Sequence, residues 1–189
     1  LFNRYVAGGG VYHNGKIYCN VYSDEAHLPE QKPVWTILDG NTYEVLYEKE
    51  LPDNCQSTTT SLAYDVTNDK IYGIVVDYST SHLVEIDPET GDMTRVGKDF
   101  DYNLRFKTLV SDNRGMLYSV VIDTKDYGQY LYKIRKTDGM AVKVKAITGK
   151  NLIGPEDYLA NNGTKQAMFI NRATGKVYWI LESSSIELD

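Results

Sequence analysis

The side chains best suited to acid–base chemistry lie together in one polar segment, residues 23–32. Its carboxylates and its imidazole could serve as the acid and the base of a lyase or a hydrolase; they belong to Asp24, Glu25, His27 and Glu30. Charged side chains are also the ordinary surface of a loop, and the sequence pairs no second carboxylate with this group. We therefore assign no catalytic residue.

Metal-binding patterns in the sequence are weak. Asp99, Asp101 and Asn103 alternate in a way that could supply oxygen ligands to Ca²⁺, but the glycine and the distant glutamate of an EF-hand loop are missing. The two cysteines, Cys19 and Cys55, and three scattered histidines do not have the spacing of a zinc site. The sequence predicts neither a metal nor another cofactor, and it leaves open whether the two cysteines pair.

Tyrosine could supply a ligand-binding surface, with 16 residues against 4 Phe and 2 Trp. A tyrosine ring packs well in a half-buried sheet while its hydroxyl stays in water, so we expect most of these residues in strands. Rings in polar, non-repeating segments could instead stack on a sugar or a peptide. The sequence thus predicts a ligand site built from three such rings and three polar neighbours: Tyr78, Tyr127, Tyr158, Ser79, Asp126 and Asn161.

The elements that would position these side chains follow from a repeat. Four copies of a turn, then Lys or Met, an aliphatic residue and Tyr, occur at residues 14–18, 68–72, 114–118 and 174–178. A second marker, an aliphatic residue before a charged one, ends at residues 39, 87, 135 and 189, which are 48, 48 and 54 residues apart. In the second copy, alternating apolar and polar residues predict four short strands within residues 61–96. A repeat of this length, made only of short strands, predicts the blades of a β-propeller.

We therefore predict an all-β fold, a β-propeller of four-stranded antiparallel blades, as a single domain or propeller fragment. About four blades are present, at residues 5–48, 58–97, 106–146 and 166–189. The four repeat tyrosines should occupy equivalent positions and pack between blades; they are Tyr18, Tyr72, Tyr118 and Tyr178. The glycines of Gly8–Gly10 should let inner strands approach one another near the axis.

An open row of blades leaves apolar sheet surface exposed. Three arrangements would cover it: a larger propeller of which this chain is a part, a four-bladed ring, or edge-to-edge self-association of two chains. The connections between strands two and three of a blade share one face with those between blades, and this face carries the predicted site. Tight turns such as Asn14-Gly15 and Pro88–Gly91 mark the opposite face.

Two segments of the second repeat, residues 83–91 (LVEIDPETG) and 68–73 (NDKIYG), carry a family resemblance. They resemble blades of secreted bacterial β-propeller repeat proteins of the YVTN, NHL and quinoprotein-like groups. The resemblance extends through all four repeats, and the third departs from it at Arg135-Lys136, where the second has Asp87-Pro88. It implies a propeller fold and an extracytoplasmic location, in the periplasm or at the cell surface. Those groups contain binding modules, structural domains and enzymes.

The composition narrows the function classes further. The net charge is −6 and no run of Lys or Arg stands out, which disfavours a nucleic-acid surface. No apolar stretch approaches the roughly 20 residues that span a bilayer. The chain begins at Leu1, so it says nothing about a signal peptide. We predict a non-catalytic ligand-binding or scaffold domain for a glycan, peptide or protein; the alternative is a propeller enzyme, a lyase or hydrolase with its site at the channel mouth.

Overall fold

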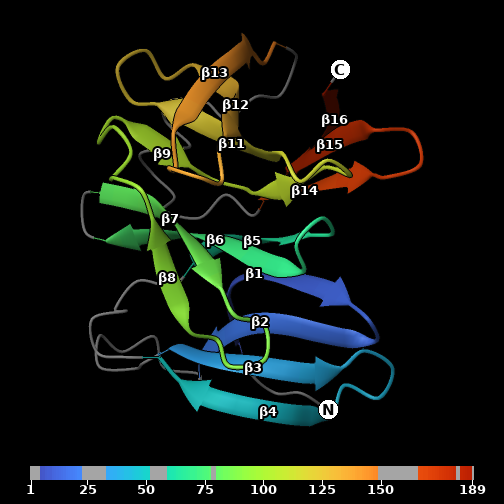
Figure 1. Ribbon diagram of the computed structural model, residues 1–189. Helices are drawn as coiled ribbons and strands as arrows, with labels where there is room; N and C mark the ends of the chain where they lie inside the picture. The colour runs from blue at the N-terminus through green and yellow to red at the C-terminus, as the bar shows by residue number, and fades with distance from the viewer. Residues whose placement is uncertain are drawn as a thin grey trace.

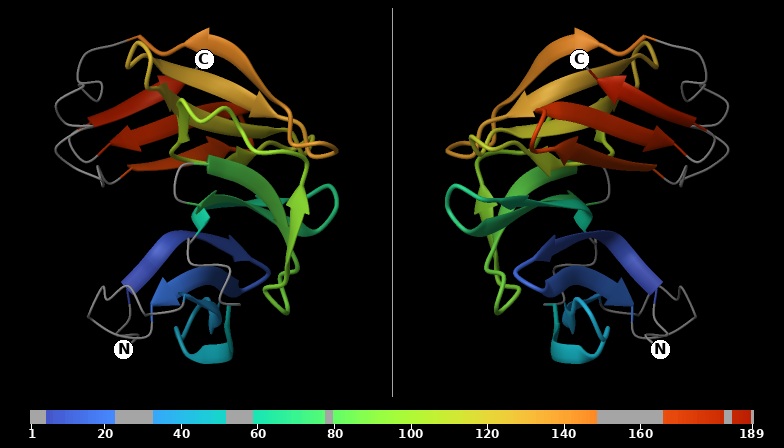
Figure 2. Two further views of the ribbon diagram at one scale, coloured as in Figure 1. Left: turned by 90° about the vertical axis from the view of Figure 1, so that its left-hand side faces the viewer. Right: turned by 90° about the vertical axis from the view of Figure 1, so that its right-hand side faces the viewer.

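The computed structural model of the protein describes residues 5–22, 33–51, 59–77, 80–148, 166–181 and 184–188. All regular elements within these ranges are β-strands, as the repeat predicts. They form four antiparallel sheets, one for each copy of the repeat, and the sheets follow one another along an arc (Figures 1 and 2). The described part of the chain has no helix with the length and apolar character needed to cross a membrane.

Each sheet is one blade, and its strands pair in chain order from the inner strand outwards. Blade 1 contains β1 (Tyr5–His13), β2 (Lys16–Tyr22), β3 (Pro33–Asp39) and β4 (Val45–Glu50). Blade 2 contains β5 (Thr59–Asp65), β6 (Lys70–Asp77), β7 (Thr80–Ile86) and β8 (Met93–Val96). Blade 3 contains β9 (Leu104–Phe106), β10 (Val110–Ser111), β11 (Leu117–Asp123), β12 (Gln129–Ile134) and β13 (Ala141–Ala146). Blade 4 contains β14 (Gln166–Asn171), β15 (Lys176–Leu181) and β16 (Ser184–Leu188).

The hydrophobic core lies between neighbouring blades. Successive side chains along a strand point to opposite faces of its sheet, so the second strand of a blade contributes to two interfaces. In β6, Ile71 packs toward blade 1, whereas Tyr72 and Ile74 pack toward blade 3. In β11, Leu117 packs toward blade 2 and Val120 toward blade 4. Because both faces are covered, these strands are apolar at nearly every position.

The repeat tyrosines occupy equivalent register positions, as predicted. Each lies in the second strand of its blade and is paired with the same repeat position of the third strand: Tyr18 with Ile37, Tyr72 with Glu85, Tyr118 with Lys133 and Tyr178 with Glu187. Tyr18 and Tyr72 are buried between blades, and Tyr118 packs against the interface of blades 3 and 4. Tyr178 stacks on Phe169 of its own sheet, and no described blade lies on it, so its packing between blades stays a prediction.

The inner strands depart from regular pairing. The sequence predicts one inner strand at residues 106–111 of blade 3, but the structure has two short strands, β9 and β10, which both pair with β11. Between them, the N–H of Val120 donates to the Thr108 hydroxyl at 3.1 Å, so a side chain replaces one backbone acceptor of the ladder. The pairings of β1 with β2 and of β5 with β6 also shift register. Such bulges bend a strand, which suits inner strands that converge on an axis.

The close approach of the inner strands β1 and β5 explains why residue 9 is glycine. A Cβ added to Gly9 would lie 3.0 Å from the backbone nitrogen of Leu62 and 3.2 Å from the Cα of Ser61. Any other residue at position 9 would therefore push β1 away from β5. This confirms, for Gly9, the predicted crowding of inner strands.

Candidate ligand-binding site

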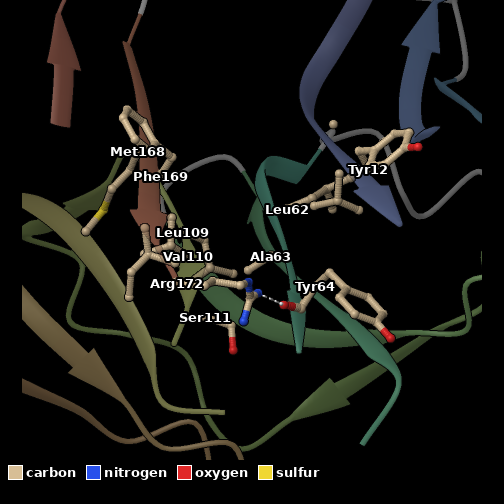
Figure 3. A pocket seen from close by; sticks show the side chains of 13 residues that line it. Tyr12, Leu62, Ala63, Tyr64, Leu109, Val110, Ser111, Met168, Phe169 and Arg172 are labelled. Carbon is tan, nitrogen blue, oxygen red and sulfur yellow. Dashed lines mark hydrogen bonds between the residues drawn. The ribbon is translucent and has the colours of Figure 1, made fainter. Parts of the chain in front are cut away.

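A cavity of about 270 Å³ lies where the four blades meet. Its wall combines β1, β5, β10 and β14, one inner strand from each blade, so it occupies the axis of the propeller (Figure 3). Aliphatic and aromatic side chains, glycine, Met168 and Ser111 form most of the described lining. Arg172 is the one described lining residue that is charged at neutral pH.

Arg172 stands at the start of the tight turn that joins β14 to β15. The side chain of Asn171 shapes this turn, because its Oδ1 accepts the N–H groups of Ala173 and Thr174 at 3.0 and 3.3 Å. Gly175 completes the turn with a φ of +74° and donates its N–H to the Asn171 carbonyl at 2.7 Å. This Asn-anchored turn places Arg172 at the rim of the cavity.

The guanidinium of Arg172 is held by two other blades. Its Nη1 donates to Asn113 Oδ1 at 3.1 Å, and its Nη2 donates to the backbone carbonyl of Tyr64 at 3.2 Å. Asn113 in turn donates its Nδ2 to the carbonyl of Arg172 at 2.8 Å. Figure 3 shows the guanidinium directed toward the backbone of Tyr64, while the rings of Tyr12 and Tyr64 point away from it. Arg172 therefore connects blades 2, 3 and 4 at the end of the channel that carries the tight turns.

Beside the cavity, Tyr64 is held in a small polar cluster. Its ring stacks on His13 with centroids 3.8 Å apart, and its hydroxyl donates to Asp69. His13 Nε2 lies 3.5 Å from the same carboxylate. Burial, followed by the hydrogen bond to Asp69, raises the pKa of Tyr64 to about 12, so the phenol stays neutral at physiological pH.

Two of the six residues predicted to bind a ligand lie in the described structure, and they share one loop. Tyr127 is half-buried and has a φ of +55°, which is uncommon for a bulky residue. Asp126 is exposed and accepts the N–H of Gly128 at 2.7 Å and the hydroxyl of Tyr130 at 2.5 Å. The hydrogen bonds from Tyr130 and then Gly128 lower the pKa of Asp126. The other four lie outside the described residues: Tyr78, Ser79, Tyr158 and Asn161.

Of the acid–base, cysteine and calcium candidates in the sequence, some lie in the described structure and others do not. The polar segment 23–32 lies outside the described residues, as does Cys55. Cys19 is a free, buried thiol, and burial raises its pKa to about 11. Asp101 Oδ1 accepts the N–H and the Nδ2 of Asn103, and Asp99 bonds to Arg95 at 2.8 Å. The described residues contain no group of three or more His, Cys, Asp or Glu that could hold a metal ion.

Comparisons with known proteins find similarity in structure alone. No family model matches the sequence, and no curated protein matches it. A chain of the Nidogen/Laminin complex superposes with a TM-score of 0.58 at 12% identity, over 97% of this chain and 59% of that chain. The fold is a β-propeller.

Two further propellers are similar at lower scores. The Dos1 propeller superposes with a TM-score of 0.47 at 12% identity, over 92% of this chain and 40% of that chain. The propeller domain of the Trilobed protease from Pyrococcus furiosus gives a TM-score of 0.43 at 12% identity, over 98% of this chain and 81% of that chain. The chain thus spans less than two thirds of the length of the first two matches.

Sequence reasoning missed Arg172. The sequence carries only a weak signal: residue 172 occupies the turn after the inner strand of the fourth repeat, where the repeat spacing aligns it with Asp112 of the third repeat and Val66 of the second. Only the arrangement of the blades shows which groups of the other repeats the Arg172 side chain meets at the axis.

Proposed function

We propose that this chain is a non-catalytic binding or scaffold propeller whose central cavity holds a carboxylate of a peptide or protein ligand. The observation that best supports this proposal is the Arg172 guanidinium at the rim of the cavity. This guanidinium carries five N–H donors, of which Asn113 Oδ1 and the Tyr64 carbonyl take one each. The remaining donors suit the planar, paired oxygens of a carboxylate.

The chemistry of the described lining favours binding over acid–base catalysis. A general acid or base must gain and lose a proton near the working pH. The described lining residues include no Asp, Glu, His, Lys or Cys, and the phenol of Tyr64 stays neutral. An arginine can orient or stabilise an anion, but it does not exchange a proton.

The cavity is slightly smaller than the pockets that hold drug-sized ligands. Drug-sized ligands occupy pockets of about 300–1,000 Å³, and this cavity holds about 270 Å³. A chain end or one acidic side chain suits it better than an oligosaccharide. The rest of a peptide or protein ligand would then lie across the exposed turns of that face.

The resemblance of residues 83–91 and 68–73 to secreted bacterial blades supports the cellular setting that we propose. In that setting the chain belongs to an extracytoplasmic bacterial protein, in the periplasm or at the cell surface. A propeller specifies the scaffold, and its activity depends on the side chains placed at its ends.

Three pools of random heptapeptides test the proposal by affinity selection and mass spectrometry. The first pool lacks Asp and Glu and has free C-terminal carboxylates, the second has the same sequences with amidated C-termini, and the third is amidated but contains Asp and Glu. We expect enrichment from the first pool if the ligand is a chain end and from the third if it is an acidic side chain. Arg172→Met should weaken binding of an enriched peptide by about 10- to 100-fold, the value of a charge-assisted hydrogen bond.

Asn113→Ala provides the matched control. It removes the bond between Arg172 Nη1 and Asn113 Oδ1, as Arg172→Met does, and also the bond from Asn113 Nδ2 to the Arg172 carbonyl. Because it keeps the guanidinium, it should weaken binding much less than Arg172→Met. Thermal unfolding of both variants separates a loss of fold from a loss of charge. Three outcomes would contradict the proposal. The amidated pool without acids could be enriched as strongly as the other two, no pool could be enriched, or the folded Arg172→Met variant could bind as well as the wild type.

A further inference from the structure

One face of blade 4 exposes a cluster of apolar side chains. In β15, Val177, Trp179 and Leu181 point toward blade 3 and are 7%, 0% and 4% exposed. The residues between them point the other way, and Ile180 is 39% exposed. On the neighbouring strand β14, Phe169 is 45% exposed and stacks on Tyr178 at a centroid distance of 4.9 Å. We call Phe169, Tyr178 and Ile180 the outer face of blade 4.

The same register positions in the preceding blades are covered by the next blade. Tyr72 and Ile74 of blade 2 pair with Glu85 and Leu83, as Tyr178 and Ile180 pair with Glu187 and Ser185. Tyr72 and Ile74 are only 2% and 0% exposed because blade 3 packs on them. In blade 3 the equivalent of Ile180 is Val120, and blade 4 buries it completely. The interfaces within this molecule therefore show what covers this position: the opposite face of a following blade.

Among the described residues, a second copy of the chain offers no free face of that kind. The face that packs onto a preceding blade carries the residues equivalent to Val177, Trp179 and Leu181. In blade 1 these are Ile17, Cys19 and Val21, and Cys19 and Val21 are 2% and 0% exposed. In blades 2 and 3 the equivalent residues are already buried in the interfaces with blades 1 and 2.

A second copy could still present its own outer face of blade 4, but the area is small. The sheet has three strands of up to six residues, so at about 4.8 Å between strands and 3.3 Å per residue it measures roughly 14 by 20 Å. The footprint of the sheet is therefore roughly 280 Å², small beside the ~800 Å² of accessible surface that each partner of a stable interface buries. A blade tethered to the chain does not need such an area, because tethering raises its effective concentration.

We propose that the outer face of blade 4 is an interface between blades, and that its occupant is a further propeller blade tethered to this chain. The occupant packs aliphatic side chains, at alternate positions of its inner two strands, onto Phe169, Tyr178 and Ile180. Phe169 also lines the central cavity, so the added blade completes one side of that cavity.

An extension of the chain by its own repeat tests this. Leu38 and Leu188 pair with Ile17 and Val177, which are equivalent positions, so a copy of residues 40–97 appended after residue 189 continues the repeat in register. The copy supplies an outer strand for blade 4 and then a blade whose Ile71 and Val75 already pack on such a face. We expect a monomer in which amide hydrogen exchange in β14 and β15 slows at least 10-fold.

The matched control is the same extension with Ile71→Asp and Val75→Asp in the appended copy, which should give no such protection. Equal exchange rates in β14 and β15 for the two extensions would overturn the proposal. So would an unextended chain that sediments as a dimer and becomes monomeric with Ile180→Asp, because a second copy would then be the occupant.

A second measurement does not depend on the extension folding. In the unextended chain, Ile180→Thr should leave the unfolding midpoint unchanged and reduce the binding of an apolar dye. Ile74→Thr, at the equivalent covered position, should lower the midpoint by several degrees. Equal shifts for both variants would show that the outer face of blade 4 is already covered and would overturn the proposal.

Discussion

Lys136 of blade 3 donates a hydrogen bond to the fully buried carboxylate of Asp65 in blade 2. The pair joins two neighbouring blades at their turn-bearing ends. Lys136 stands where the second repeat has Pro88, whose carbonyl instead accepts the indole N–H of Trp35 from blade 1 at 3.1 Å. The same repeat position thus ties a blade to the preceding one in two chemically different ways.

Removing the cation of this pair should be costly. Lys136→Met leaves a buried carboxylate without its counter-ion, and we expect the free energy of unfolding to fall by about 3 kcal/mol or more. Urea titration at pH 7 measures this. Lys16 and Glu89 form an exposed pair between blades 1 and 2, and Lys16→Met should cost less than about 1 kcal/mol. Equal costs for the two variants would show that burial adds nothing to the Asp65 pair.

The same pair should make stability depend on acid pH. Burial raises the pKa of Asp65, but hydrogen bonds from Lys136 and Thr67 outweigh this and leave the pKa below its ordinary value of 3.8. Because the pKa of Asp65 is lower in the folded protein, the ionised carboxylate stabilises the fold at any pH above the ordinary pKa of 3.8. This contribution is lost as the pH falls through the lower, folded pKa. The difference in unfolding free energy between wild type and Asp65→Asn should therefore be constant from pH 7 to about pH 5 and shrink below pH 4; a difference that grows on acidification would contradict it.

The repeat tyrosines should differ in their contribution to stability although they share one register position. Tyr72 is 2% exposed, and Tyr72→Ala should lower the free energy of unfolding by about 3 kcal/mol or more, as for other large core truncations. Tyr178 stacks on Phe169 without a covering blade, and Tyr178→Ala should cost about 1 kcal/mol. Chemical denaturation of both variants measures the two free energies of unfolding. A loss below about 0.5 kcal/mol for Tyr72→Ala would show that Tyr72 behaves as a surface residue.

Two turn glycines should respond differently to a methyl group. Gly15 and Gly91 have φ values of +77° and +72°, so alanine is strained at both, by about 1–2 kcal/mol. A Cβ at Gly15 meets nothing within 4 Å, whereas one at Gly91 would overlap the Trp35 ring, 2.6 Å from its Cδ1. Gly91→Ala should therefore destabilise the protein by at least about 1 kcal/mol more than Gly15→Ala. Thermal unfolding of the two variants measures the difference, and equal midpoints would mean that the Trp35 ring can move aside.

The predicted aromatic site on the face opposite the tight turns remains a prediction. If it exists, the triple variant Tyr78→Ala, Tyr127→Ala and Tyr158→Ala should lose binding to members of glycan or peptide arrays that the wild type binds, because ring stacking supplies the contact. The variant must keep the far-ultraviolet circular dichroism of the wild type. Equal binding by both proteins would move the site elsewhere, and the Arg172 cavity would then be the candidate to test.

The blades could be predicted from the sequence alone. The spacing of the repeat, the alternation of apolar residues and turn residues such as Asn14-Gly15 predict the strands and their order, because these signals are local and each strand pairs with its neighbour in the chain. The repeat position of Tyr72 was likewise readable from the sequence. For the candidate site, the residue types and the shared loop of Tyr127 and Asp126 were readable from the sequence.

The side chains that meet between blades could be identified only from the packing of the sheets. Tyr72 and Tyr178 have the same local pattern, yet one is buried and the other is left on an uncovered face, because burial depends on the presence of a following sheet. Arg172, Asn113 and Tyr64 come from three repeats and meet because three inner strands converge on one axis. Lys136 and Asp65 are 71 residues apart in the chain. Such contacts follow from the angle between successive blades, which is set by the packing of whole sheets and leaves no mark in any short stretch of sequence.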